Sequence, residues 1–485
     1  MIARTKKSPA APLSRPSEPE EGTSERRQKL GEVIANKIMA DIEVRGWPVG
    51  ELIGSESELI ARYGVSRAII CEAVRQVERH GVAEMQRGGG RGLVVTSSPS
   101  RAVSRSISTY LELCNVSLEQ QYEAWRVIEV WAVGVATIKV SDENCARLRE
   151  MANGLLTNPH ATQVEAMALR IAVADATENP VIGLFMRSLA RVLTMFVRPD
   201  LRRGGGRVWK ARMSLELADL VEAIVARDIA LANHLARTAL EHREEVSRRL
   251  GPLRPDLSPG PFIRETPQKR AEVVAIAIAN DLEQRKPAVG EKLGEEPELQ
   301  VRYDTSRGVF RQAVRILETH GLVRTRRGPG GGLFVGQRSD EYTVTSAVAY
   351  MKGMKAQLSD VAAVQTELMG KLAQLAAERG DSAQKASLAE ALEHFVGSAS
   401  EQERRRAVQS VYQQLGMMAG NQVLGLLSTI LNTFVVQSAK PSRMTAESAA
   451  LFVSAVEAVI EEDGAMARRS MTHHLMAAIQ RLQSK

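Results

Sequence analysis

The sequence has few of the residues that stabilise small secreted domains or anchor a chain in a membrane. Its 485 residues include only three cysteines, Cys71, Cys114 and Cys145. Their odd number and wide spacing argue against a disulfide framework or a zinc motif and are typical of a reducing cytoplasm. No apolar run approaches the ~18 residues of a transmembrane helix, and the N-terminus lacks an apolar signal-peptide segment. We therefore expect a cytoplasmic protein.

Aromatic residues are also scarce, at 4% of the chain, whereas 44% of the residues are hydrophobic and 25% are charged. Cores built from aliphatic side chains favour helices, and the balance is that of an ordinary globular protein. The length corresponds to about three to five domains of roughly 100–200 residues. A net charge of +7 and a pI near 9.3 give a mild indication of a polyanionic partner.

The chain contains an internal repeat. Val49–Val95 and Val289–Val335 align without a gap at an offset of 240 residues, and 23 of 47 positions are identical. Weaker similarity continues in ENPVIGLF, which starts at Glu178, and GNQVLGLL, which starts at Gly420. We infer two tandem copies, each with a small domain followed by a larger one.

Each small domain is predicted to be a winged helix-turn-helix. In copy one, an apolar helical stripe is followed by Ser55 and Glu58, the capping-box pattern of a short helix. Ser66 is a suitable N-cap for a third helix over Arg67–His80, which Gly81 ends. Two short extended segments with RGGGRG between them complete the pattern as a glycine-tipped hairpin.

The third helix and the hairpin carry the candidate DNA-binding residues. In copy two, Arg307, Arg311 and Arg315 form a stripe at intervals of four residues. An arginine can bind guanine bidentately in the major groove or contact a phosphate, and glycines in the hairpin let the backbone approach DNA closely. The candidate set is Ser66, Arg67, Arg75, Arg87 and Gly90 in copy one, and Ser306, Arg307, Arg311, Arg315, Arg327 and Gly330 in copy two.

Arginines on a helix can also serve only to solvate it. A stripe alone would favour that interpretation. The stripe together with the turn signals, the basic glycine-rich hairpin and the duplication favours DNA binding instead.

The segments SESELIARYGVSRAIICEAVRQVERHGV and EEPELQVRYDTSRGVFRQAVRILETHGL resemble the signature of GntR-type bacterial transcription regulators. In that family an arginine after the serine that opens the recognition helix contacts DNA, and here it corresponds to Arg67 and Arg307. A second family arginine lies four residues further on and corresponds to Arg311, whereas copy one has Cys71 there.

A third family arginine corresponds to Ser57 in copy one and to Pro297 in copy two. The resemblance thus implies that copy two keeps two of the three DNA-contacting arginines and copy one keeps one. It therefore implies weaker base readout by copy one than by copy two, with the phosphate contacts of copy one retained.

The larger domains show helical periodicity over residues 99–250 and 339–485. Each resembles the all-helical effector-binding and dimerisation domain of the FadR-like (FCD) branch of the same family. Many members of that branch hold a divalent metal. The corresponding positions here are Ala166, Arg170, Leu217 and Ala239 in copy one, and Val408, Tyr412, Phe452 and His474 in copy two. One imidazole cannot make a divalent site of normal affinity, so we expect no metal and no cofactor.

The predicted fold is mainly α, with two winged helix-turn-helix domains that carry small β wings, each followed by an all-helical bundle. We place a disordered tail at residues 1–26 and a proline-rich linker at 251–266. The winged domains are placed at 27–98 and 267–338, and the helical domains at 99–250 and 339–485.

The predicted function is that of a sequence-specific DNA-binding transcriptional regulator, expected to be a repressor in the bacterial cytoplasm at the nucleoid. The two helical domains are predicted to pack as an intramolecular pseudo-dimer, with a further homodimer left open. Both winged domains would then bind one imperfectly palindromic double-stranded operator, under the control of a small-molecule effector, with no membrane partner.

The alternative is a ligand-binding or protein-interaction module whose winged helices lack specific DNA readout. Cys71 and Ser57 favour this for copy one, and the arginine stripe of copy two opposes it. We expect no enzyme, because the sequence has no Ser/His/Asp set and no catalytic carboxylate pair. RGGGRG also lacks the Lys-Ser/Thr of a Walker loop.

Overall fold

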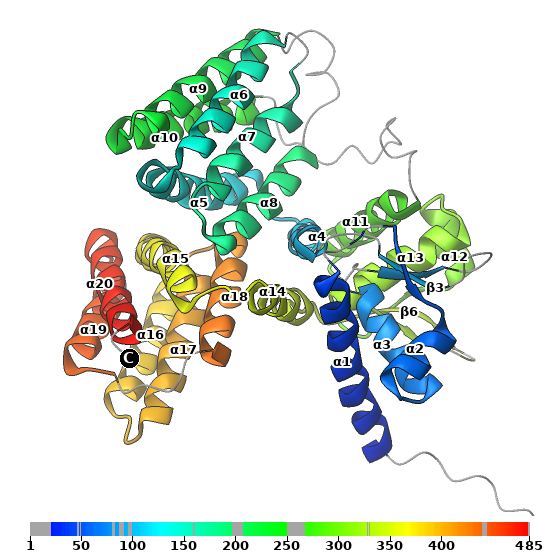
Figure 1. Ribbon diagram of the computed structural model, residues 1–485. Coiled ribbons are helices and arrows are strands. Elements are labelled where there is room, and N and C mark those ends of the chain that lie inside the picture. The colour runs from blue at the N-terminus through cyan, green and yellow to red at the C-terminus, as the bar shows by residue number, and fades with distance from the viewer. Residues whose placement is uncertain are drawn as a thin grey trace, which may run out of the picture. The chain divides into compact units, whose positions relative to one another are not determined.

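The computed structural model describes residues 21–45, 48, 50–79, 83–86, 92–95, 99–158, 161–195, 207–249, 267–326, 328, 330–438 and 444–483. Over these residues the chain forms twenty helices and six short strands (Figure 1). It divides into two units, Met1–Ala102 and Val103–Lys485. The predicted fold class, mainly α with two winged helix-turn-helix domains, is confirmed.

The first unit contains the first winged domain, called head one here. Its elements are α1 (Glu21–Val44), β1 (Leu52–Gly54), α2 (Glu56–Tyr63), α3 (Arg67–Arg79), β2 (Ala83–Gln86) and β3 (Gly92–Val95). The strands form an antiparallel sheet in the order β1-β3-β2. Ile38 of α1, Leu59 of α2 and Ile70 of α3 are fully buried and join the three helices around one core.

Helix α1 begins at Glu21, inside the segment for which we predicted disorder. The last proline of that segment is Pro19. Proline lacks the backbone N–H that a helix interior needs and restricts the residue before it. The charged sequence after Pro19 contains no proline and can therefore be helical. As a result, α1 includes the six residues before residue 27, where we placed the start of the domain.

The short helix α2 begins with the capping box that the sequence indicates. The Ser55 hydroxyl accepts from Glu58 N at 3.3 Å, and Glu58 Oε2 accepts from Ser55 N at 2.7 Å. Gly64 ends the helix in the left-handed region at φ 62°, where a residue without a side chain is favoured. These local signals fix the turn that separates α2 from α3.

The second winged domain, called head two here, repeats this architecture within the second unit. Its elements are α11 (Pro267–Arg285), β4 (Lys292–Gly294), α12 (Glu296–Arg302), α13 (Arg307–Thr319), β5 (Val323–Arg326) and β6 (Gly332–Val335). The strand order is β4-β6-β5. Gly332 has φ 139°, and a Cβ there would lie 2.6 Å from Gly294 O. The close approach of β4 and β6 therefore requires glycine.

Helical domain one comprises α4 (Pro99–Leu113), α5 (Leu118–Lys139), α6 (Asp142–Thr157), α7 (Gln163–Asp175), α8 (Pro180–Met195), α9 (Arg207–Val225) and α10 (Ile229–Arg249). Helical domain two comprises α14 (Glu341–Gly353), α15 (Leu358–Arg379), α16 (Ser382–Val396), α17 (Glu401–Met418), α18 (Gln422–Ser438), α19 (Ala446–Ile460) and α20 (Gly464–Gln483). Each domain thus repeats the same succession of helices.

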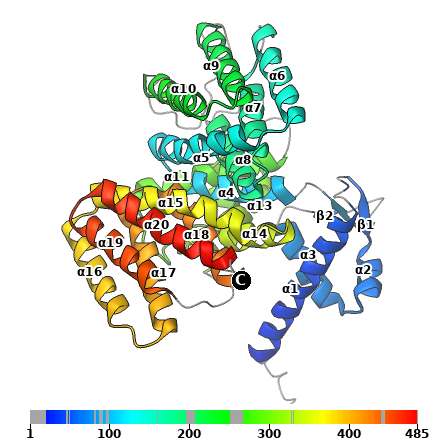
Figure 2. The same ribbon diagram turned by 60° about the vertical axis from the view of Figure 1, so that its left-hand side comes forward.

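The two helical domains share one hydrophobic core. It includes Trp125 of α5 and Phe185 of α8 from copy one, and Leu368 of α15 and Leu427 of α18 from copy two, all fully buried. Both views show α5 and α8 beside α15 and α18 (Figure 1, Figure 2). The aliphatic faces of the two copies therefore cover each other within one chain.

Polar contacts across this core are reciprocal. Asn179 Nδ2 donates to Asp360 O at 3.0 Å, and the equivalent Asn421 Nδ2 donates to Gln120 O at 3.0 Å. Gln120 and Asp360 are themselves equivalent, 240 residues apart. Each asparagine oxygen also accepts from the first turn of its own helix, at 3.0 Å. The same patch thus meets its own copy, as in a two-fold symmetric dimer interface.

Candidate nucleic-acid interface

Helix α13 of head two separates an apolar face from a cationic face. Its buried residues are Val309, Phe310, Ala313, Val314 and Leu317. Arg307, Arg311 and Arg315 are exposed along the helix, with side-chain exposures of 69% for Arg307 and 57% for Arg311. The predicted stripe therefore faces solvent, in the way that a helix entering a DNA groove requires.

One carboxylate in head two binds two arginines of this stripe. Glu296, the first residue of α12, accepts from Arg307 Nε at 3.0 Å through Oε1. Arg311 donates to both oxygens of Glu296, from Nε at 2.9 Å and from Nη2 at 3.2 Å. Hydrogen bonds and charge from Arg311 and Arg307 hold the pKa of Glu296 below its usual range. The carboxylate is therefore ionised wherever the protein is folded near neutral pH.

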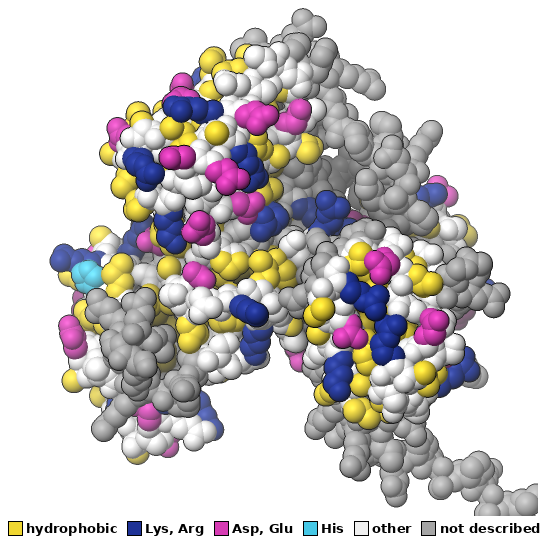
Figure 3. All heavy atoms as spheres, viewed as in Figure 1, with side chains coloured by type: hydrophobic (Ala, Val, Ile, Leu, Met, Phe, Trp, Pro, Cys, Tyr) yellow, Lys and Arg dark blue, Asp and Glu magenta, His cyan; other side chains and the backbone are white. Residues whose placement is uncertain are grey.

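Head one has the same carboxylate, and in the part of this head that the structure describes one arginine lies beside it. Arg67 Nε donates to Glu56 Oε1 at 2.5 Å, and Cys71, which replaces the second arginine, has its Sγ 3.9 Å from the same oxygen. Further along α3, Arg75 Nη1 donates to Glu72 Oε2 at 2.9 Å. In Figure 3, Lys and Arg side chains gather with Asp and Glu on the face over α2 and α3. The recognition helix of head one therefore carries one arginine fewer on this face than that of head two.

The serines that open the recognition helices stand where the sequence places them. Ser66 O accepts from Ile69 N and Ile70 N, and Ser306 O accepts from Phe310 N. Ser306 has the extended backbone of an N-cap, and its side chain makes no capping hydrogen bond. Both serines are exposed next to the first arginine of the helix.

The wing of head two is partly described. Gly330 has φ 76°, in the left-handed region. On β5 the Arg326 guanidinium lies over the Phe334 ring, 4.4 Å from its centroid, in cation–π geometry. Arg87, Gly90 and Arg327 of the predicted set lie outside the described residues.

Sequence reasoning missed the two glutamates. Glu56 and Glu296 are identical in the two copies, and each lies eleven residues before the first arginine of the recognition helix. This shared spacing could have indicated that each glutamate binds the first arginine of its recognition helix. At the third family position, Ser57 bonds Ser55 at 3.1 Å between hydroxyl oxygens, and Pro297 is in the first turn of α12.

Two protein-family models match this chain, each of them twice. The model for bacterial regulatory proteins of the gntR family matches residues 30–93 and 270–335. The FCD domain model matches residues 120–242 and 360–477. The chain belongs to the GntR family, in its FCD branch. Since each model matches twice and in the same order, this GntR protein is a tandem duplication of the whole two-domain unit.

Solved structures similar to this chain include Streptococcus agalactiae GntR, at 22% identity and a TM-score of 0.36, covering 44% of this chain and 100% of that one. Escherichia coli McbR/YncC follows, at 14% identity and a TM-score of 0.25, covering 46% and 98%. A transcriptional regulator of the GntR family from Pseudomonas syringae pv. tomato has 19% identity and a TM-score of 0.21, covering 44% and 86%.

Three of the four residues to which the family resemblance assigns a metal site lie together in copy two. His474 Nε2 lies 3.1 Å from the Tyr412 hydroxyl, and its Nδ1 lies 2.7 Å from Ser448 O. The ring of Phe452 is 5.2 Å from the imidazole, centroid to centroid. Both ring nitrogens of His474 therefore have protein partners, and the neighbours offer no second ligand of the metal-binding type. These residues do not fit a metal.

The same place in copy one holds a buried ion pair. Glu129 of α5 accepts hydrogen bonds from Trp125 Nε1 and from Arg170 Nη1, and all three side chains are buried. Arg243 of α10 is buried nearby and acts on Glu129 through its charge. Within the described ranges, no group of three or more His, Cys, Asp and Glu side chains could hold a metal ion.

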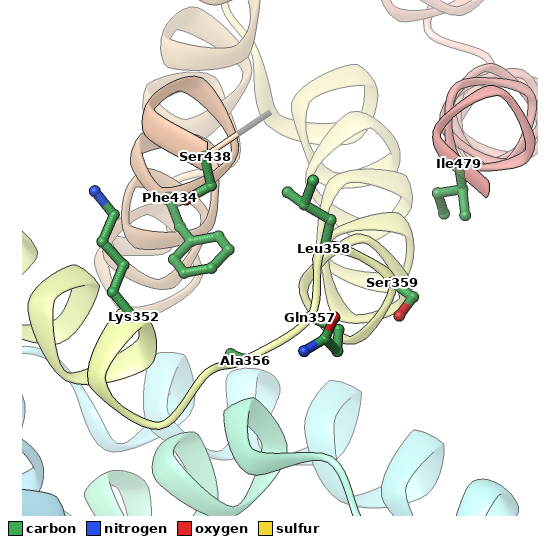
Figure 4. Close-up of a pocket in the computed structure, with 8 residues that line it drawn as sticks. All are labelled: Lys352, Ala356, Gln357, Leu358, Ser359, Phe434, Ser438 and Ile479. Carbon is green, nitrogen blue, oxygen red and sulfur yellow. The ribbon is translucent and has the colours of Figure 1, made fainter. Parts of the chain in front are cut away.

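Helical domain two has an open pocket of about 450 Å³ where α14 turns into α15 (Figure 4). It is lined by Lys352, Ala356, Gln357, Leu358, Ser359, Phe434, Ser438 and Ile479. Lys352 Nζ donates to Gln437 Oε1 at 2.8 Å. The pocket shares no lining residue with the His474 cluster.

Among the helices that the structure describes, none combines the length and the apolar character that crossing a membrane requires.

Proposed function

We propose that this GntR regulator is a repressor whose single chain binds one operator with two unequal heads, under the control of a small-molecule effector. The observation that carries the proposal is the exposed stripe of Arg307, Arg311 and Arg315 on α13. A helix with this surface can enter a major groove, where arginine binds guanine O6 and N7. Arg67 and Arg75 on α3 supply the weaker counterpart.

The fused chain takes the role that a dimer plays in other helix-turn-helix regulators. The shared core and the reciprocal Asn179 and Asn421 contacts support this, because they pair the helical domains as two-fold interfaces do. Fusion removes the concentration dependence of pairing and raises the effective concentration of the second head to ~mM. The chain should therefore occupy its operator at concentrations where an unlinked pair would dissociate.

The heads differ at the positions that face DNA, so the operator should be an imperfect palindrome. Head two offers Arg307 and Arg311, whereas head one offers Arg67 and Cys71. A thiol is a weak donor and cannot bind guanine bidentately. The half-site bound by head two should be the more constrained one.

Genomic footprinting of the full chain, followed by transcription from the bound promoters, tests the proposal. We expect protected sites with two unequal half-sites about one helical turn apart, and lower transcription when protein is added. An effector should release the protein, and candidates are the substrates of the enzymes encoded next to each site.

The second candidate is an interaction module without specific readout, which Cys71 favours in head one. Uniform, salt-sensitive binding with no protected sites would support that module and reject the regulator proposal. Protected sites with raised transcription would reject repression alone.

A further inference from the structure

Glu296 is placed to control what the two arginines of head two can bind. Arg307 uses only Nε for its contact with Glu296. Within the described residues, its two Nη groups have no hydrogen-bond partner. Arg311 is held more tightly, through Nε and Nη2. The two guanidinium groups are thus ordered side by side before any DNA arrives.

Because Glu296 binds Arg307 through Nε, the two Nη groups stay available to contact a base. The two Nη groups together can donate to O6 and N7 of one guanine. A single carboxylate also offsets the repulsion between two cations four residues apart on one helix face, which favours the paired arrangement. An arginine pair that is already ordered loses less side-chain entropy on binding.

The negative charge of Glu296 also discriminates between the two acceptors that DNA offers. A phosphate oxygen carries negative charge and is repelled by a carboxylate a few ångströms away. The acceptors on guanine are neutral and are not repelled in this way. Glu296 therefore disfavours phosphate contacts by Arg307 and Arg311 and leaves guanine contacts available.

From these observations we propose that Glu296 is a specificity-determining residue of head two, which positions Arg307 and Arg311 for base contacts and repels phosphate from them. This inference rests on the proposed function. Head one keeps the carboxylate as Glu56 but has one arginine to position, at 2.5 Å, with Cys71 in place of the other. Among the residues that the structure describes, the arrangement of one carboxylate that holds two arginines is therefore found in head two and not in head one.

The test measures affinity for two DNA probes at two salt concentrations. One probe is the duplex that the wild-type chain itself selects from a randomised pool, and the other is a random duplex of equal length. The variants are Glu296→Ala and Glu296→Gln in the full chain. Glu298→Ala is the structural control, because Glu298 caps the same helix, accepting from Glu295 N at 3.4 Å, without touching an arginine. Glu56→Ala is the matched control in head one.

We expect Glu296→Ala to bind the random duplex about fivefold more tightly, the effect of removing one charge ~4 Å away in water. Its preference for the selected duplex should fall about tenfold, and its salt slope should steepen by about one. Glu296→Gln should show the same steeper slope, with a smaller loss of preference because the amide oxygen still accepts from arginine. Glu298→Ala should keep the wild-type preference within about twofold. Glu56→Ala should tighten binding to both duplexes alike, because it frees a phosphate contact of Arg67, and should therefore also keep the preference within about twofold.

Several outcomes would overturn this inference. If Glu296→Ala keeps both the preference and the salt slope of the wild type, Glu296 plays no part in readout. If Glu298→Ala loses as much preference, the effect comes from the helix and not from the carboxylate. If circular dichroism shows that Glu296→Ala does not fold, the isosteric Glu296→Gln takes its place, and a salt slope equal to that of the wild type overturns the inference. A wild-type chain that selects no duplex would instead reject the proposed function.

Discussion

Replacing Glu129 by methionine should destabilise helical domain one sharply. Glu129 and Arg170 are 3% and 2% exposed, and the carboxylate accepts from both Arg170 and Trp125. Burial raises the pKa of Glu129, and the charges of Arg170 and Arg243 oppose that rise. The substitution therefore leaves two guanidinium groups in the interior with no carboxylate between them.

Breaking a buried ion pair by removing one partner costs about 3–5 kcal/mol, because the remaining charge is left uncompensated. Side-chain volume contributes little here, since copy two has the fully buried Met369 at the equivalent position. Removing all three charges together, with Arg170→Met and Arg243→Met added, should cost less than Glu129→Met alone. Replacement of a whole buried ion cluster by apolar side chains is often neutral.

Hydrogen exchange of the backbone amides in α5 and α7 measures this loss of stability locally. A single unfolding midpoint does not, because the chain has several domains. At tenfold per 1.4 kcal/mol, protection in these helices should fall by about 100-fold to 4,000-fold. Glu222→Met is the control, because it breaks an exposed pair with Arg149, 2.7 Å apart, in the same domain. Exposed pairs contribute about 0–1 kcal/mol. Equal losses in both variants would refute the argument for a buried, charged pair.

Three further predictions concern other parts of the chain. Arg311→Ala should cost about 1–3 kcal/mol of specific binding and relax one base position, and Cys71→Ala should cost little; titrations on selected and random duplexes check this. Specific binding lost only in Cys71→Ala would mean that head one reads the operator. Burial raises the pKa of Glu112 to about 8, above its value in the unfolded chain. Stability should therefore fall as pH rises from about 4.5 to 8. Glu112→Gln should flatten this dependence in the hydrogen-exchange protection of α4, corrected for the intrinsic exchange rate at each pH; an unchanged profile contradicts it. Elemental analysis should find no stoichiometric zinc, nickel or manganese, because His474 lacks co-ligands, and one tightly bound ion per helical domain would refute this.

Most elements of the two heads could be predicted from the amino-acid sequence. Ser55 with Glu58 starts a helix and Gly64 ends it through interactions within a few residues, so these signals can be read along the chain. The arginine stripe could be read for the same reason, since residues four apart on a helix share a face. Because the two copies align at an offset of 240 residues, each element predicted in one copy could also be predicted in the other. Composition was a poor guide at the start of copy one, where α1 already includes residues 21–26, which contain no proline and which we assigned to a disordered tail.

The contacts between side chains of different elements could not be predicted in this way and depend on how the elements pack. Glu296 reaches Arg307 and Arg311 because the turn between α12 and α13 brings two helices together, and no periodicity encodes that angle. Glu129 and Arg170 are 41 residues apart. Asn179 and Asp360, which join the two copies, are 181 residues apart. Such contacts form when buried apolar faces pack, and the hydrophobic effect that drives packing is non-directional. The sequence therefore indicates that these faces pack, and the fold determines which polar groups they bring together.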